Sequence, residues 1–122
     1  MKIAGLGFRA GATVASLRSA LAAAGGAGGV TALATGEAKA AAAVIVAYAA
    51  ELGLPIVGVS AADLAAQTTL TNSARVRAKT GAGSLAEAAA LAVIGSNAGL
   101  SGPRAVSEDH MATAAIAVEV TP

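Results

Sequence analysis

The sequence predicts an α/β fold, a three-layer α/β/α sandwich built on a small mixed sheet. Short apolar segments bounded by glycine or proline alternate with longer segments whose apolar residues recur at helical spacing. Such alternation is typical of a sheet that helices cover on both faces. Near the C-terminus two predicted strands follow each other without a helix between them, which indicates an antiparallel pair. The 122 residues are expected to form one domain, residues 1–122.

The first half of the chain is expected to contain three strands and two helices. Thr13 is typical of a helix N-cap, and Gly25 and Gly26 are typical of a helix end. The predicted elements are a strand over 2–7, a helix from 14 to the glycines, a strand over 30–35, a helix from 37 to about 52 and a strand over 56–59.

The second half is expected to be less regular. Ser84 and Glu87 match the capping box, in which a serine is followed three residues later by a glutamate, so a helix is predicted to run on to residue 94. The other expected elements are a short helical turn over 61–66, a polar loop over 67–72, one or two helical turns within 73–80, a turn-rich stretch over 99–109 with strand character at 105–106, and a strand over 112–120.

The composition limits both the core and the chemistry. Alanine and glycine occupy 52 of 122 positions, and isoleucine, leucine and valine supply only 27, so close approach of backbones has to compensate for thin side chains. The chain has no cysteine, which excludes disulfides, thiolate nucleophiles and iron–sulfur clusters. A single histidine excludes a His-rich metal site. No metal and no cofactor are therefore expected.

Charge and hydropathy exclude two classes of partner. A net charge of +1, no tryptophan, one phenylalanine and one tyrosine provide neither the basic surface nor the stacking platforms of a nucleic-acid-binding protein. The mean hydropathy of +0.71 reflects alanine content, because the strongest apolar stretch, 40–50, falls well short of the roughly 20 residues of a membrane span. A soluble cytoplasmic protein without a membrane partner is expected.

A glycine-rich turn after the first predicted strand is the main candidate site. It contains Gly5, Gly7, Arg9, Gly11 and Thr13 between a strand and a helix. Backbone N–H groups at a helix start favour an anion, and an arginine there suits a carboxylate or phosphate. A tight turn between strand and helix, with no role in binding, explains the glycines equally well. A loose dinucleotide fingerprint is a third interpretation, but no acidic residue ends the second predicted strand.

Other polar residues have structural and functional interpretations. Arg75, Arg77, Lys79 and Arg104 form either a solvated face or a binding surface for a small polyanion. His110, the only imidazole, is either a plain surface histidine or the partner of a serine nucleophile. No second carboxylate is spaced to form an acid–base pair with Glu87.

Three blocks cover nearly the whole chain in order. They are Gly5-x-Gly7-Phe8-Arg9-x-Gly11-x-Thr13; then Ala32-Leu33-Ala34-Thr35, Lys39 and Ala49-Ala50-Glu51-Leu52-Gly53-Leu54-Pro55; then Ser73-Ala74-Arg75-Val76 and Gly83-Ser84-Leu85-Ala86-Glu87-Ala88-Ala89-Ala90-Leu91. Together they resemble the family of CobE and the C-terminal domain of CbiG, proteins of cobalamin biosynthesis. The departures are Ala12-Thr13 in place of Thr-Ser, Ala42 in place of an acidic residue and Arg104 in place of a frequent lysine.

The resemblance implies a domain that acts on a corrinoid intermediate, with other enzymes of the pathway as further partners. One function is a binder that holds a precorrin through the glycine and arginine turn. The alternative is a hydrolase that opens the lactone of cobalt-precorrin-5A and releases acetaldehyde, with Thr13, Ser73 or Glu87 as catalytic candidates. A nucleotide-binding module is the third possibility. The expected ligand-binding residues are Gly5, Gly7, Arg9, Gly11, Thr13, Lys39, Ser73 and Arg104.

Overall fold

The computed structural model describes residues 1–67, 85–95 and 97–119, which build a six-stranded mixed sheet. The strand order is β3-β2-β1-β6-β4, and β5 also pairs with β6. The parallel strands are β1 (Lys2–Phe8), β2 (Ala32–Gly36) and β3 (Ile56–Val59). The antiparallel part is made by β6 (Ala112–Glu119), which pairs with β1, β4 (Ala98–Leu100) and β5 (Ala105–Val106). The predicted mixed sheet is confirmed.

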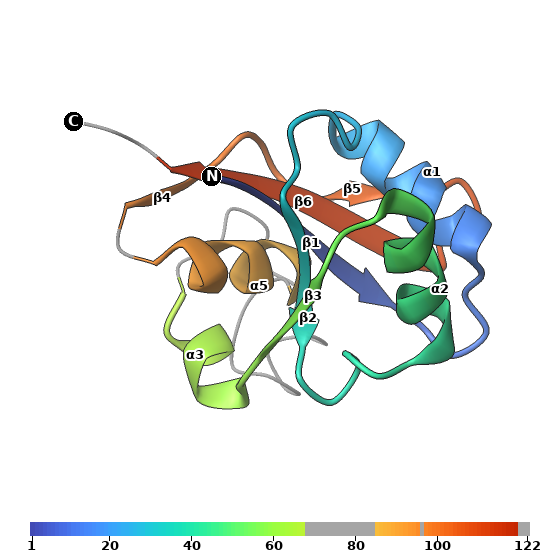
Figure 1. The fold of residues 1–122 in the computed structure, drawn as a ribbon, viewed down its shortest axis with the longest axis horizontal. Coiled ribbons are helices and arrows are strands. Elements are labelled where there is room, and N and C mark those ends of the chain that lie inside the picture. Colours follow the sequence, from blue (N-terminus) through green and yellow to red (C-terminus); the bar gives the residue numbers. More distant parts are fainter. Residues whose placement is uncertain (68–84, 96, 120–122) are drawn as a thin grey trace.

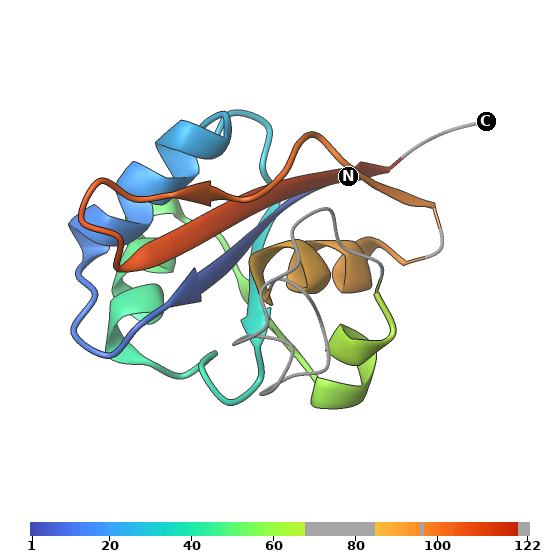
Figure 2. The same ribbon diagram turned by 180° about the vertical axis from the view of Figure 1, so that it is seen from behind.

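Helices cover both faces of this sheet (Figure 1). On one face lie α1 (Val14–Ala24) and α2 (Ala43–Leu52), and on the other lie α3 (Ala61–Ala65) and α5 (Leu85–Ile94). The reverse view shows α5 against the sheet on the side away from α1 (Figure 2). The predicted three-layer α/β/α architecture is confirmed.

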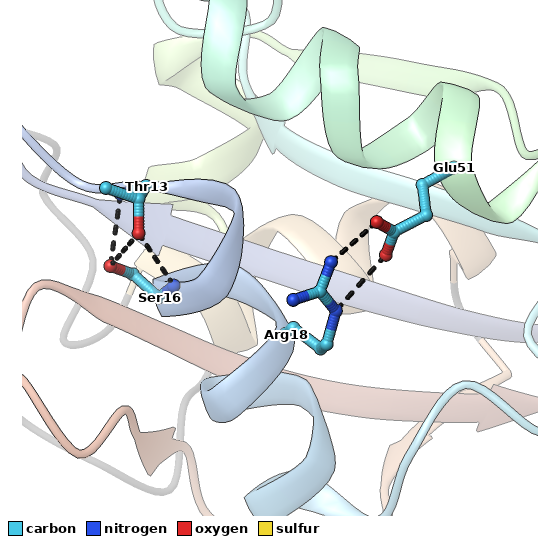
Figure 3. A network of polar contacts seen from close by, with 4 residues as sticks. All are labelled: Thr13, Ser16, Arg18 and Glu51. Atoms are coloured by element: carbon cyan, nitrogen blue, oxygen red, sulfur yellow. Dashed lines mark hydrogen bonds and ion pairs between the residues drawn. The ribbon is translucent and has the colours of Figure 1, made fainter.

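The ends of α1 follow the expected capping residues. The Thr13 hydroxyl accepts a hydrogen bond from the Ser16 N–H at 3.3 Å, and the Ser16 hydroxyl accepts one from the Thr13 N–H at 3.1 Å (Figure 3). This reciprocal pair satisfies N–H groups that the first turn of a helix leaves without internal partners. Gly25 ends the helix with a φ of 131°, a backbone conformation that residues other than glycine rarely adopt.

Two expectations about secondary structure are wrong. The helix predicted from residue 37 begins only at Ala43, because the Glu37 N–H donates to the Val59 carbonyl and extends the pairing of β2 with β3. The Lys39 ammonium then donates to the carbonyl of Phe8 and holds the segment against the end of β1. The short strand β4 was not predicted, because its three residues gain strand geometry only from pairing with β6.

Some expectations concern residues 68–84, which lie outside the described residues. These are most of the polar loop, the helical turns within 73–80, Ser73, the basic residues Arg75, Arg77 and Lys79, and the capping serine Ser84. Helix α5, which follows, is present as predicted and ends at Ile94.

Candidate functional site

The chain turns sharply where β1 ends. The Ala12 N–H donates to the Arg9 carbonyl at 3.1 Å, which closes a four-residue turn with Gly11 at its third position and a φ of 92°. A left-handed residue at this position is the reason the turn needs glycine. The Arg9 N–H donates to the Met111 carbonyl at 2.9 Å, so the turn is tied to the segment before β6 while the Arg9 side chain stays exposed.

An open cleft of about 1180 Å³ lies beside this turn. Its volume exceeds the roughly 300–1,000 Å³ of ordinary small-molecule pockets. It lies at the carboxyl end of β1 and beside the first residues of β6, which pairs with β1. α/β proteins commonly bind ligands outside the carboxyl ends of parallel strands such as β1. Its described lining comprises residues 7–12, 38–39, 42–44, 85, 104, 106 and 110–113.

The described lining of the cleft combines positively charged side chains with small apolar ones. Arg9, Lys39 and Arg104 line it, and none of the described lining residues is acidic. Most of the remaining wall is alanine and glycine, with Phe8, Leu85 and a few other apolar side chains. An anion whose body is apolar and broad therefore fits the chemistry of this cleft.

The fold holds the ammonium of Lys39 and the main chain of Arg104. The Lys39 ammonium donates to the Phe8 carbonyl and lies 4.9 Å from the centroid of the Phe8 ring, so its charge is fixed at the end of β1. The main-chain N–H of Arg104 donates to Oε2 of Glu87 at 3.1 Å. Glu87 is fully buried in α5 and is not among the residues that line the cleft.

A hydrogen-bonded turn before β6 forms the opposite wall. Oδ1 of Asp109 accepts bonds from the Ser107 hydroxyl at 2.6 Å and the Met111 N–H at 3.0 Å, and Oδ2 accepts one from the Ser16 hydroxyl at 2.6 Å. These donors, the Ser107 hydroxyl first and then Ser16, lower the pKa of Asp109 to about 2. The carboxylate therefore joins this turn to the first turn of α1, and His110 lies within it at a φ of 59°.

The structure brings together five of the eight expected ligand-binding residues. These are Gly7, Arg9, Gly11, Lys39 and Arg104. Gly5 lies instead beneath α5, and Thr13 uses its hydroxyl to cap α1; neither is among the cleft-lining residues. Ser73 lies outside the described residues.

The wall also contains residues that were not expected to bind ligand. His110, Met111 and Thr113 reach the cleft because β6 pairs with β1 about 100 positions away in sequence. From the sequence, His110 is expected to be only a nucleophile's partner or a plain surface residue. Its left-handed backbone, which only the structure shows, is a feature that clusters at functional sites.

The described part of the chain has neither a metal-binding cluster of side chains nor a membrane-spanning helix. Within residues 1–67, 85–95 and 97–119, no group of three or more histidine, aspartate or glutamate side chains is arranged to hold a metal ion. None of the helices in these same ranges combines the length and the apolar character that crossing a membrane requires.

The fold and the cleft define an α/β domain with a cationic, apolar-walled cleft at the end of its central strand. The chain matches the family described as "Cobalamin synthesis G C-terminus" over residues 2–117 and belongs to it. It is a cobalamin biosynthesis protein of the CbiG/CobE type.

Two solved structures are similar over nearly the full chain. The crystal structure of CobE, a protein from the cobalamin (vitamin B12) biosynthetic pathway, is 30% identical with a TM-score of 0.85, and the match covers 100% of this chain and 92% of CobE. The cobalamin biosynthesis protein chiG from Agrobacterium tumefaciens str. C58 is 36% identical with a TM-score of 0.73, covering 99% and 100%. No curated protein matches the chain.

Proposed function

We propose that the protein binds a tetrapyrrole intermediate of cobalamin biosynthesis in the cleft at the end of β1. The observation that carries the proposal is the cleft's lining, in which Arg9, Lys39 and Arg104 lie on small apolar walls. Precorrins are broad, largely apolar rings fringed with acetate and propionate groups. Arginine pairs with such carboxylates through two parallel N–H donors, and alanine and glycine leave room for the ring.

In this proposal the guanidinium of Arg9 makes the main polar contact with the ring carboxylates. Its side chain is exposed at the cleft, and its backbone is held by the bond to Met111. The guanidinium is therefore accessible to a ligand and does not pack in the core. The first turn of α1 is already capped by Thr13 and Ser16. Recognition of the ring carboxylates is therefore assigned to the side chains that line the cleft and not to the helix end.

The test is a titration with cobyrinic acid, a corrin whose acetate and propionate groups are free. Arg9→Ala is expected to weaken binding by about ten- to a hundredfold, because a hydrogen bond to a charged group contributes about 1.5–3 kcal/mol. Arg9→Lys is expected to recover part of this, since a point charge lacks the planar fork of donors. Added salt should weaken binding less steeply in Arg9→Ala than in the unaltered protein.

Arg18→Ala is the matched control, because Arg18 is an exposed arginine of α1 that does not line the cleft. It is expected to bind like the unaltered protein. Equal affinity for the unaltered protein, Arg9→Ala and Arg18→Ala would remove Arg9 from the site. Failure of the unaltered protein to bind cobyrinic acid would overturn the proposed function itself.

Hydrolysis of a ring lactone is the second candidate, and the observation that favours it is the imidazole of His110 in the cleft lining. The earlier candidates are less well placed: the Thr13 hydroxyl caps α1, and Glu87 is buried away from the cleft. Incubation with cobalt-precorrin-5A separates the two functions. A hydrolase releases acetaldehyde and loses this activity in His110→Ala, whereas a binder returns the substrate unchanged.

A further inference from the structure

A buried carboxylate lies behind the cleft without contributing to its lining. Glu87 is 0% exposed, in a helix whose inward face is otherwise mostly alanine. Burying a carboxylate is costly unless it is hydrogen-bonded. One of its bonds is described: Oε2 accepts the main-chain N–H of Arg104 at 3.1 Å, across 17 positions of sequence.

The segment that donates this bond lies between β4 and β5. It includes Gly102 and Pro103, it belongs to no helix or strand, and the Ser101 N–H donates to the Ile116 carbonyl at its start. Arg104 is partly buried and lines the cleft. Its main chain is therefore held by the bond to Glu87 of α5 and, through the next residue, Ala105, by the pairing of β5 with β6.

We propose that Glu87 is a positioning residue, which fixes the main chain of Arg104 so that the guanidinium meets a carboxylate of the bound ring. The proposal rests on the proposed function. A bond from an N–H to a carboxylate is about twice as strong as one between neutral groups, so it restrains the segment well. Binding is tighter when a charged side chain is held in its bound position beforehand, because less conformational freedom is lost.

This role differs from that of a catalytic acid or base. Glu87 is enclosed by the fold, whereas a group that moves a proton has to reach the substrate directly or through one water. Its expected influence on the ligand passes through Arg104. Coupling between the two residues is therefore the measurable consequence.

A double-mutant cycle with cobyrinic acid tests this coupling. Glu87→Leu, which keeps the bulk and removes the acceptor, is expected to weaken binding about tenfold, and Glu87→Gln, a neutral acceptor, about threefold. In the Arg104→Ala background both substitutions are expected to change affinity less than about twofold. Leu91→Ala is the matched control, because Leu91 is a buried residue of α5 and its loss should lower stability without changing affinity.

A second ligand separates positioning from general damage. Cobinamide has amides in place of the carboxylates, so its affinity is expected to be insensitive to Glu87→Gln. Equal losses with and without the Arg104 side chain, or equal losses for both ligands, would overturn the positioning role. If Glu87→Leu does not fold, Glu87→Gln provides the same cycle. If the unaltered protein binds cobyrinic acid but the cycle shows no coupling between Glu87 and Arg104, the positioning role is rejected and the proposed function stands. If the unaltered protein does not bind cobyrinic acid, the proposed function is rejected.

Discussion

The two faces of the sheet are packed in different ways. The face under α1 and α2 is filled by bulky side chains, among them Leu17, Leu33, Ile45 and Tyr48. The face under α5 is filled largely by alanines, and the helix backbone approaches β1 directly at Gly5. One face is therefore stabilised by side-chain volume, and the other by close contact between backbones. The difference indicates that the α5 face tolerates added side-chain volume less well than the face under α1 and α2.

The largest expected effect is that of Gly5→Ala. A Cβ at this position would lie 1.9 Å from the carbonyl oxygen of Ala86 and 3.0 Å from the amide nitrogen of Ala90, so α5 would have to move away from the sheet. Overpacking of this kind costs 1–3 kcal/mol and sometimes more, and against rigid backbone we expect a loss of about 3 kcal/mol or a failure to fold. Urea unfolding measures the loss.

Gly7→Ala is the matched control on the same strand. The atom that its Cβ would meet first is the Thr113 hydroxyl at 2.8 Å, and a side chain can rotate away where a helix backbone cannot. We expect a loss of about 1 kcal/mol. If the two substitutions cost the same, close backbone contact does not distinguish the α5 face.

An intermediate effect is expected from Asp109→Asn, which acts at the α1 face. The pKa of Asp109 is about 2 in the folded protein against an ordinary value of 3.8, so its ionised form stabilises the fold. This contribution is fully present above about pH 4 and is lost as the pH falls through the folded pKa. The unaltered protein should therefore exceed Asp109→Asn in stability at neutral pH, and the gap should close between about pH 4 and pH 2.

Thermal unfolding over this pH range measures the gap. Asp63→Asn is the control, because Asp63 lies in α3, away from the hydroxyl network around Asp109. A gap that stays constant from pH 7 to pH 2 would mean that the ionised carboxylate of Asp109 does not hold the turn to α1.

The smallest effect is expected from Arg18→Ala. Arg18 and Glu51 form an ion pair between α1 and α2 with an N–O distance of 2.5 Å, but the two side chains are 54% and 44% exposed (Figure 3). Exposed pairs contribute little and are screened by salt. We expect the melting temperature to fall by about a degree or two at low salt and to be unchanged in about 1 M NaCl. A loss comparable to that of Gly5→Ala would contradict the view that α1 is held by its buried leucines.

Local chemistry in the sequence determined much of the fold. The capping of α1 by Thr13, its end at Gly25, the strand Ile56–Val59 and the order of strands and helices all follow from interactions between residues close together in the chain. The sequence predicts the start of α2 too early, because an alanine-rich stretch has no capping signal. Bonds from Glu37 and Lys39 to distant strands decide where the helix begins.

The site was only partly predictable from the sequence. The glycine turn and its arginine were identifiable because strand, turn and helix are contiguous, and the resemblance to the CobE and CbiG family was confirmed. The sequence could not distinguish Gly11, which the turn requires for its left-handed backbone, from Gly5, which makes room for α5. That distinction depends on which residues pack from elsewhere in the chain.

Tertiary structure alone decided which side chains share the cleft. Pairing of β6 with β1 places His110 and Met111 opposite Arg9, and burial of Glu87 under the β4–β5 segment links α5 to Arg104. Sequence patterns report the preferences of neighbouring residues, whereas these contacts join positions 17 to more than 100 residues apart. Local sequence therefore determined the helices and strands, and the pairing of the strands in the sheet determined which of their residues form the site.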